Sequence, residues 1–454
     1  MKALALIVCA ATVTSLVSQP ARSADFSAAV ETRAEGWLVK SYSQIDAPTS
    51  PKDTNVELNE LKAITAKRTA DDVSRFHWWA VGGPVYRWNE IIVDELLENF
   101  VTLPLAARHL ALFHAALDDA VAVALHHRKS AARPAPVVTD PLIKTALQGS
   151  SGSSFPSDYA AAAAAAADVL AYIFPSRTKA FVAKADEAMQ TRLLAGVEYP
   201  SDVAAGRAIG QRIATLAIAR GQSDESDAKW TGSVPEGPGK WKGSNPIAPL
   251  AATWKPWVLA RPDEFRPSPP PAFDSEAVKA ALGELKAFSR TPKSNHLAIY
   301  WEVYGGARAH ALWNEVARMK VLEQGEALSA LTMSRVFAAL NIAFLDSAIA
   351  CWDGKYAYWY IRPTQLDPEL KSVFPPPNHP SYPAAHGCLS TAAATVLARV
   401  FPSDRDRLLA HGKEAAEARI WAGIHYRFDI DAGQEIGRKV AARTLERAFV
   451  SRTP

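Results

Sequence analysis

Five residues in the C-terminal third of the chain have the types needed to bind one tetrahedral oxyanion. Three of them, Lys355, Arg362 and Arg419, carry positive charges that could neutralise the oxygens of a phosphate or vanadate, and the two guanidiniums offer planar forks of donors. The other two are His386 and His425. One imidazole can bond to the central atom while the second gives or takes a proton near neutral pH. This division of labour suits in-line displacement at a tetrahedral centre.

The spacing of these residues forms three motifs in a fixed order. They read K-x6-R-P from Lys355, P-x-x-H from Pro383 to His386, and R-x5-H-x3-D from Arg419 to Asp429. One such motif recurs by chance or on a solvated charged surface, but three in this order are hard to produce accidentally. The array resembles that of the vanadium-dependent haloperoxidases and their relatives, the phosphatidic-acid-phosphatase type 2 (PAP2) acid phosphatases.

The likeness to haloperoxidase-type sequences also extends upstream of the motifs. It includes Trp88-Asn89, the stretch 104–121 with H-A-A-x-D-D-A-V at His114, the segment 346–358, and the Trp- and Pro-rich segment 254–271. These stretches cover most of the chain after about residue 80. They favour the larger haloperoxidase-like branch over the compact acid phosphatases.

The resemblance implies a role for each motif residue. His425 would be the ligand of the vanadate, or the phosphorylated nucleophile of a hydrolase, and His386 would be the catalytic acid or base. Lys355, Arg362 and Arg419 would bind the oxyanion, with Lys355 also polarising a bound substrate. Asp429 stands one helical turn after His425 and would orient the local network. The alternative for Asp429 is a surface or capping carboxylate.

The central motif departs from the family pattern. Relatives usually read P-S-G-H, whereas this chain has Pro383-Ala384-Ala385-His386. The serine hydroxyl that would donate to the anion is therefore missing, while the backbone amide of Ala385 can still donate. Loss of one such donor costs about 3 to 4 kcal/mol of transition-state stabilisation. Ser381 and Ser390 stand nearby, but the sequence does not show that either reaches the anion.

Two neighbouring positions bear on the choice of halide. Bromide-using relatives tend to carry a histidine where His379 stands, and chloride-using ones an aromatic residue. Trp352, in contrast, looks like the chloride-using pattern. Because bromide and iodide are easier to oxidise than chloride, we expect one of these two. His379 could instead be a loop histidine without a catalytic role.

Three functions are compatible with the motifs. The first is a vanadium-dependent haloperoxidase that oxidises halide with hydrogen peroxide, with His386 accepting a proton and Lys355 polarising the peroxide. The second is a phosphomonoesterase in which phosphate takes the place of vanadate, His425 attacks phosphorus and His386 protonates the leaving alkoxide. The third is an oxyanion-binding protein whose active site has decayed. Chain length and the upstream likeness favour the peroxidase.

The elements that position these residues belong to an internal repeat at a constant offset of 227 residues. Val169-Leu170-Ala171 and Phe174-Pro175-Ser176 match Val396-Leu397-Ala398 and Phe401-Pro402-Ser403. A fixed register over a long span indicates two related structural units. The first unit lacks the chemistry, because Tyr159 stands where His386 would be and Glu198 where His425 would be. Arg192 and Asp202, the counterparts of Arg419 and Asp429, would persist there as a structural ion pair or as surface charges.

Both units are predicted to be helical. Long apolar stretches with little Pro or Gly are typical of bundle helices, and the alanine run that stops before Pro175 has high helix propensity. We therefore expect an all-α fold of two related four-helix bundles, with the anion site in the C-terminal bundle and near helix N-termini. The helical stretches are 88–97, 106–126, 159–174, 328–360 and 390–401.

The repeat also defines the predicted organisation of the chain. Residues 1–23 would be a signal peptide, 24–79 an arm that is extended or holds a short helix, and 80–220 the first, non-catalytic bundle. Residues 221–295 would be an irregular connection rich in Pro and Trp, and 296–454 the catalytic bundle. Trp254 and Trp257 in the connection could wall the substrate channel or only attach the loop to the bundles.

The N-terminus predicts export. Lys2 precedes an apolar run over residues 3–17 and then Ala21-Arg22-Ser23, as in a secretory signal peptide. At about 15 residues the run is short for a spanning helix, which needs roughly 20. We expect no other segment to cross a membrane, so the mature protein would be periplasmic or secreted. Cys351 and Cys388 could then form a disulfide or remain free thiols.

Charge excludes some partners. The formal net charge is +3, and both signs alternate along the chain, which indicates neither a nucleic acid nor an anionic membrane as partner. The local positive charge at the motifs instead indicates a small anion. The sequence leaves open whether the chain forms a homodimer.

Overall fold

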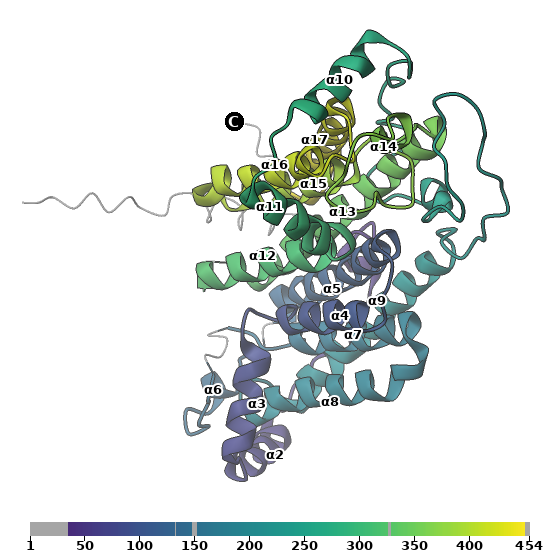
Figure 1. The fold of residues 1–454 in the computed structure, drawn as a ribbon. Coiled ribbons are helices and arrows are strands. Elements are labelled where there is room, and N and C mark those ends of the chain that lie inside the picture. The colour runs from purple at the N-terminus through teal and green to yellow at the C-terminus, as the bar shows by residue number, and fades with distance from the viewer. Residues whose placement is uncertain (1–34, 132, 148–151, 326–327, 450–454) are drawn as a thin grey trace, which may run out of the picture.

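The computed structural model describes residues 35–131, 133–147, 152–325 and 328–449. Within these ranges the chain forms helices and no strand, and its isolated β-bridges join Pro134 to Ser153 and Lys240 to Tyr360. The predicted all-α fold is confirmed. Figure 1 shows two helical halves stacked on each other, with the N-terminal half below and the C-terminal half above. The predicted signal peptide lies outside the described residues.

The N-terminal half begins with short helices in the predicted arm and continues into long ones. Its helices are η1 (Tyr42–Gln44), α2 (Asn55–Ala66), α3 (Ala70–Ala80), α4 (Tyr86–Glu98), α5 (Leu103–Ala131), α6 (Pro136–Thr139), α7 (Asp158–Ile173), η2 (Pro175–Arg177), α8 (Thr178–Leu194) and α9 (Pro200–Gln222).

The C-terminal half contains the predicted anion site. Its helices are η3 (Pro249–Thr253), α10 (Glu276–Ala287), α11 (Pro292–Glu302), η4 (Val303–Ala307), α12 (Ala309–Gln324), α13 (Ala330–Tyr358), α14 (Pro363–Leu366), α15 (Ala385–Val400), η6 (Pro402–Asp404), α16 (Arg405–Ala422) and α17 (Arg427–Ala448).

The 227-residue offset of the sequence recurs in the helix boundaries. Leu103–Ala131 and Ala330–Tyr358 differ by this number at both ends, and so do Asp158–Ile173 and Ala385–Val400. The helices α5, α7, α8 and α9 therefore correspond to α13, α15, α16 and α17. Local signals explain the shared boundaries, since α7 and α15 each stop one residue before a Phe-Pro pair, and proline cannot continue a helix.

The repeat extends further upstream than the sequence comparison indicated. Trp88-Asn89-Glu90 in α4 recurs as Trp313-Asn314-Glu315 in α12. The two asparagines meet, because Asn89 Nδ2 donates to Asn314 Oδ1 over 2.7 Å, and Asn314 in turn bonds to Asn341 of α13. A buried amide network thus joins the two halves. We missed this match because the spacing here is two residues shorter than in the rest of the repeat.

The core of the molecule runs through α5 and α13, which pack against each other and against α7 and α15. In α13 every residue from Leu331 to Lys355 is buried. Among the described residues, α13 is the one helix long and apolar enough to cross a membrane, and its apolar window lies wholly inside the protein. This composition does not test the prediction that no segment after the N-terminus crosses a membrane, which stays a prediction. A helix that is apolar all round belongs in a core as well as in a membrane.

The predicted arm and connection are more ordered than expected. The arm contains α2 and α3, and the connection contains α10 and η3. Each of α3 and α10 begins with a side-chain cap: Thr69 Oγ1 accepts from Asp72 N, and Ser275 Oγ accepts from Val278 N. These capping residues were the sequence signals that we overlooked.

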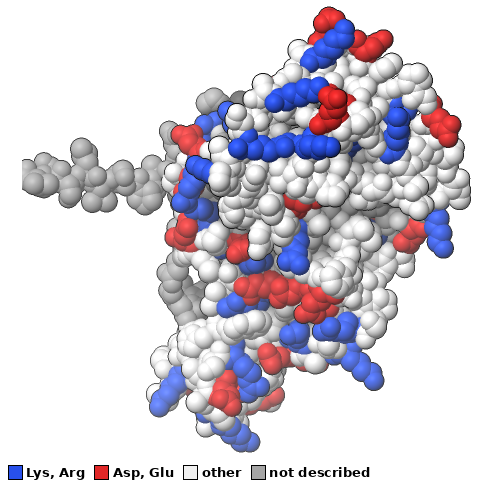
Figure 2. Space-filling view, viewed as in Figure 1, with Lys and Arg blue, Asp and Glu red and all other residues white. Residues whose placement is uncertain are grey.

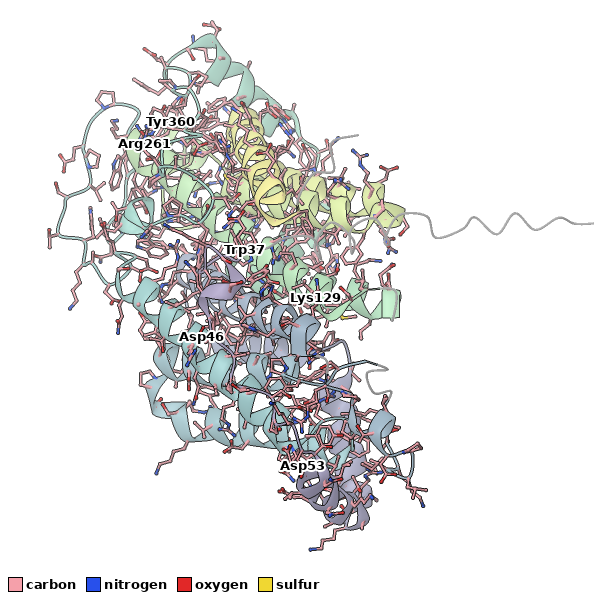
Figure 3. All side chains as sticks on the ribbon, turned by 180° about the vertical axis from the view of Figure 1, so that it is seen from behind. Trp37, Asp46, Asp53, Lys129, Arg261 and Tyr360 are labelled. Atoms are coloured by element: carbon pink, nitrogen blue, oxygen red, sulfur yellow. The ribbon has the colours of Figure 1, made fainter. Side chains whose placement is uncertain are left out.

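The arm also contacts the ion pair that joins the two halves. The Trp37 indole donates to Asp118 over 2.8 Å, and the Trp37 backbone amide donates to Asp119 over 2.8 Å. Asp118 is paired with Arg335 of α13 at 2.6 Å, both fully buried. Figure 3 labels Trp37, which lies where the N-terminal and C-terminal halves meet.

The connection is attached to the end of α13 that carries the first anion-site motif. Hydroxyl groups of Tyr358, Tyr360 and Tyr382 donate to the carbonyls of Pro267, Pro271 and Ser268, over 2.6, 2.7 and 2.8 Å. Further back, the Asp346 carboxylate of α13 accepts from the amides of Trp257, Val258 and Leu259. Hydrogen bonds therefore hold the connection, residues 221–295, against α13, and we call this segment the strap. Trp257 could wall the substrate channel or attach the loop to the bundles, and its hydrogen bond to Asp346 is of the second kind.

The charges retained in the first half are largely buried. Arg192 pairs with Glu198 at 3.2 Å, and Asp202 pairs with Arg133 at 2.8 Å. Neither Arg192 nor Asp202 is a surface charge, and each has a partner that the repeat did not reveal. On the face seen in Figure 2, the exposed Lys and Arg side chains are interspersed with Asp and Glu.

Candidate anion-binding site

All motif residues of the sequence lie at helix ends, and hydrogen bonds connect several of them. Lys355 lies in the last turn of α13, Arg362 precedes α14, His386 lies in the first turn of α15, Arg419 lies in the last turn of α16, His425 lies between α16 and α17, and Asp429 lies in the first turn of α17.

Lys355 is fully buried and fixes the loop that leads into α15. Its Nζ donates to the carbonyls of Pro380, Ser381 and Pro383 over 2.9, 3.2 and 2.5 Å. Burial lowers the pKa of Lys355 to about 8. All three N–H groups are occupied by the protein, so an anion must replace a carbonyl to bond directly to Lys355. At greater distance the ammonium still contributes its charge.

Arg362 connects the first motif to the third. Its Nη1 lies 2.9 Å from His425 Nε2 and donates to the Ile424 carbonyl over 3.0 Å. Because a guanidinium can only donate, His425 Nε2 must carry a lone pair. Burial lowers the pKa of Arg362. The contact thus presents His425 with its nucleophilic nitrogen unprotonated.

Asp429 fixes the other side of the same imidazole. Its Oδ2 accepts from His425 Nδ1 over 2.8 Å, from Ser381 Oγ over 2.6 Å and from Tyr426 N over 3.1 Å. Burial raises the pKa of Asp429 to about 6, against the lowering effect of the Ser381 hydrogen bond. The carboxylate therefore holds the ring and selects the tautomer with the proton on Nδ1. Of the alternative interpretation, the surface carboxylate is wrong because Asp429 is buried, whereas the capping role is present, since Asp429 accepts from the Tyr426 amide at the start of α17.

The two serines that stand near the motif do not replace the missing family serine. Ser381 donates to Asp429, and Ser390 accepts from the Trp313 indole over 3.2 Å. Ala384 is fully buried and packs in an apolar cluster with Leu370 and Ile430, among others. The site therefore lacks a serine hydroxyl at this position.

His386 is held by a backbone carbonyl from α11. Its Nε2 lies 2.9 Å from the Trp301 oxygen, and since a carbonyl can only accept, Nε2 carries the proton. The lone pair is then on Nδ1. Burial, followed by the charge of Arg419, lowers the pKa of His386 well below its usual 6.5. His386 is therefore neutral at physiological pH and able to act as a base.

Arg419 has free donors in the interior of the protein. Its Nη2 donates to Glu302 over 2.7 Å, whereas its Nε and Nη1 are buried and have no protein partner among the described residues. Buried donors of this kind normally have a partner, so an anion would satisfy them. Sequence reasoning missed both Glu302 and Trp301, because they precede the motifs by many residues and at no recognisable spacing.

His379 is part of the site's wall. It is buried, its Nδ1 lies 3.1 Å from both Arg362 Nη2 and the Pro380 carbonyl, and its ring centroid lies 5.5 Å from that of Trp352. Burial lowers the pKa of His379 well below 6.5. The histidine is therefore not a solvated loop residue, and its effect on halide choice stays a prediction.

The two cysteines are free and buried on neighbouring helices. Burial and then a hydrogen bond with Cys351 raise the pKa of the Cys388 thiol well above 9. Of the two alternatives, a disulfide and a pair of free thiols, the structure has the free thiols.

The residues present fit a tetrahedral oxyanion such as vanadate or phosphate. His425 has a lone pair on Nε2, which accepts from Arg362 until an anion takes its place, and Arg419 offers two nitrogens, Nε and Nη1, that have no partner among the described residues. The N-terminus of α15 has no capping side chain, since Ala384 occupies that position. The amide of Ala385 and the positive end of the helix are thus open to an anion.

Comparison with solved structures gives the same fold. The chain is similar to a bacterial vanadium-dependent iodoperoxidase, with a TM-score of 0.61 and 20% identity over 80% of this chain and 95% of that one. It is also similar to a bacterial vanadium-dependent chloroperoxidase, with a TM-score of 0.55 and 15% identity over 76% of this chain and 92% of that one. At these identities the likeness shows a shared fold.

Curated relatives match a shorter stretch. A non-specific acid phosphatase of Providencia stuartii is 32% identical over 62 residues, and one of Salmonella typhi is 36% identical over 63 residues. Each match spans 14% of this chain and a quarter of the phosphatase. A family model described as PAP2 superfamily matches residues 110–223 and 331–449, which together make up half of the chain and correspond to the two halves of the repeat. The chain belongs to the PAP2 superfamily.

Proposed function

We propose that the protein is a vanadium-dependent haloperoxidase-like enzyme that oxidises bromide or iodide with hydrogen peroxide. The observation that carries this choice is the extent of the structural likeness. The iodoperoxidase is matched over 95% of its chain, whereas the acid phosphatases are matched over a quarter of theirs. Both chemistries use the same anion site, so the motifs alone do not separate them.

Vanadate, when bound, supplies a Lewis-acidic centre that activates hydrogen peroxide. His425 would hold it through Nε2, and Asp429 keeps that nitrogen unprotonated by binding Nδ1–H. Arg419 and the Ala385 amide would donate to its oxygens. Lys355 and Arg362 offset the negative charge.

His386 would move the proton. Its Nδ1 carries the lone pair because Nε2–H is directed to the Trp301 carbonyl. The lowered pKa of His386 keeps the ring ready to accept a proton from hydrogen peroxide. The protonated imidazole can return that proton to the hypohalite as it leaves, which yields hypohalous acid.

The preference for bromide or iodide rests on His379 beside Arg362 and on the ease of oxidation of these halides. The Trp352 ring is tilted by 49° against that of His379, and its indole N–H donates to the Ile247 carbonyl over 3.0 Å. Its N–H is therefore occupied by the protein. This supports the histidine as the residue that distinguishes the site.

The second candidate is an acid phosphatase, favoured by the local identity to the non-specific acid phosphatases. His425 Nε2 would attack phosphorus, and a protonated His386 would release the alcohol. Water would then cleave the phosphohistidine with His386 as base.

Parallel assays separate the candidates. Purified protein, with and without vanadate, is tested for peroxide-dependent bromination of monochlorodimedone and for hydrolysis of p-nitrophenyl phosphate. Vanadate-dependent bromination supports the peroxidase, and phosphate release that vanadate inhibits supports the phosphatase. His425→Ala should abolish either activity, while His296→Ala, at an exposed position of α11, should leave it unchanged. Silence in both assays would indicate a decayed site or an untested substrate.

We also propose that the protein is exported, to the periplasm or outside the cell. The support is the predicted signal peptide, with cleavage after Ser23. Fractionation of expressing cells, with the N-terminus of the mature chain measured by mass spectrometry, tests this. A chain that stays in the cytoplasm with residues 2–23 attached would contradict it.

A further inference from the structure

The first half of the molecule keeps two of the three cations of the second site at the positions that the repeat predicts, while Ala135 stands where Arg362 would be. Arg128 in α5 corresponds to Lys355, and Arg192 in α8 corresponds to Arg419. The correspondence extends to contacts, because Arg128 Nη2 donates to the Pro156 carbonyl over 2.6 Å just as Lys355 donates to that of Pro383. The two halves therefore share the contact between this cation and the loop before the next helix.

Carboxylates of the chain itself occupy the first site. Arg192 is paired with Glu198 at 3.2 Å, and Glu198 stands where His425 stands in the second half. Arg128 is paired with Asp158 at 2.7 Å, in the first turn of α7. The Arg192 guanidinium also lies 3.9 Å from the ring centroid of Tyr159, the counterpart of His386.

The four charges balance in a largely buried cluster. The side chains of Asp158 and Glu198 are 7% and 4% exposed, and those of Arg128 and Arg192 are 19% and 12% exposed. Burial raises the pKa of Asp158, whereas the charge of Arg128 lowers it. The resulting pKa lies below the usual value of an aspartate. In the second half the balance differs, since two buried nitrogens of Arg419, Nε and Nη1, have no partner in the described part of the chain.

A cavity adjoins one side of the first site. A cavity of about 430 Å³ is lined by Arg128 and Asp158 together with residues of α5 and the start of α13. Lys129, labelled in Figure 3, lies on its wall. A small anion in this cavity would meet the Arg128–Asp158 side of the cluster, whereas Arg192 and Glu198 do not line the cavity.

We propose that the first half contains a latent site for a small tetrahedral oxyanion, which the Glu198 carboxylate fills as an internal substitute for the ligand. The native chain then binds one oxyanion, in the second half, although its scaffold is duplicated. Removal of the Glu198 carboxylate leaves the Arg192 guanidinium without its ion-pair partner and frees the space that the carboxylate fills. Inorganic phosphate should bind there.

The test is calorimetric titration with inorganic phosphate. The parent protein for this test carries Arg419→Ala, which removes the free donors of the second site. This parent should bind no phosphate. Addition of Glu198→Ala should raise the stoichiometry from zero to one per chain. The unfolding temperature of the doubly substituted protein should then rise with phosphate concentration, while that of the parent should not.

Two matched variants identify the source of the binding. Arg192→Ala added to Glu198→Ala should abolish the new site. Asp186→Ala, which removes an exposed carboxylate paired with Arg207 in the same half, should create none. Glu198→Ser takes the place of Glu198→Ala if the latter does not fold. A folded variant without phosphate binding would overturn the proposal, and so would failure of both variants to fold even at high phosphate. None of these readouts depends on turnover.

Discussion

At the residue scale, the protonation states of the site are set by groups that can only donate or only accept. Arg362 donates to His425 Nε2, and Asp429 accepts from Nδ1. The Trp301 carbonyl accepts from His386 Nε2. One histidine thus presents a lone pair at Nε2 and the other at Nδ1. The asymmetry suits one nucleophilic or ligating imidazole and one acid–base imidazole.

The contact between Asp429 and His425 leads to the first prediction. Asp429→Asn keeps the shape of the side chain but no longer stabilises the Nδ1–H tautomer. We expect kcat and the affinity for the oxyanion to fall about 10- to 100-fold, as for other residues that orient a ligating histidine. Steady-state kinetics and vanadate titration measure this. Asp431→Asn, an exposed neighbour on α17, is the control, and equal behaviour of the two variants would contradict the role of Asp429.

Lys355 leads to a prediction about pH. Its pKa is lowered to about 8, and a lysine is charged below its pKa. The affinity for sulfate, whose own charge is constant here, should therefore be full near pH 7 and fall as pH rises through about 8, by up to tenfold per unit. Lys355→Met should bind sulfate more weakly at pH 7 and lose this dependence. A midpoint near pH 8 that persists in Lys355→Met would assign the titration to another group.

The residues of the site could be predicted where the signal is local. The motif from Arg419 to Asp429 spans the end of one helix and the start of the next, so its spacing in sequence reflects spacing in space. Glu302 and Trp301 could not be found this way, because they reach the site through the packing of α11 against α16. The contact of Ser381 with Asp429 was equally hidden, since it joins two loops.

At the element scale, the strap formed by the connection supports the end of α13. Arg266 makes two hydrogen bonds of 2.6 Å to Asp353, two residues before Lys355. The Tyr360 hydroxyl, on a residue labelled in Figure 3, holds the same strap at Pro271. The sequence predicted an irregular connection because residues 221–295 are rich in Pro, Trp, Gly and Ser. The tyrosine–carbonyl contacts that order it have no signature in sequence.

Arg266→Met should loosen this strap. The change leaves the Asp353 carboxylate, whose side chain is 8% exposed, without its partner. Since Arg266 is 40% exposed, water moderates the effect, and we expect a loss of about 1 to 3 kcal/mol in the free energy of unfolding. Urea unfolding measures it, and limited proteolysis should become faster within residues 255–272. Arg261→Met, which breaks an exposed pair with Asp263, should change neither. Similar effects of both variants would argue against a specific strap.

The helices themselves were predictable wherever an apolar run ended at a helix breaker. The stretch 159–174 is close to α7, and 328–360 is close to α13. The prediction for 390–401 began five residues late, because the first turn of α15 carries site residues and lacks a capping side chain. The local pattern is weakest where the site is formed.

At the scale of the whole molecule, the two halves share one core. The helix α13 belongs to the catalytic half by sequence, yet one of its faces packs on α5 of the other half. Arg335 of α13 is fully buried and forms its ion pair with Asp118 of α5. The division at residue 296 predicted from sequence therefore describes the origin of the repeat better than it describes independent folding units.

Residues 296–454 produced alone should accordingly fail to fold. The fragment would expose the α5-facing side of α13 and leave Arg335 unpaired, and loss of one partner of a buried pair alone costs about 3 to 5 kcal/mol. Domains are typically stable by only about 5 to 15 kcal/mol, so these losses should exceed what the fragment retains.

Circular dichroism should show no cooperative thermal transition, and sulfate should not restore one. Co-expression with residues 24–295 should return a soluble complex that binds one oxyanion, because the missing face and Asp118 are supplied in trans. A fragment that unfolds cooperatively by itself would show instead that α15, α16 and α17 are sufficient to cover α13, and that the first half is an attachment to the site instead of part of its core.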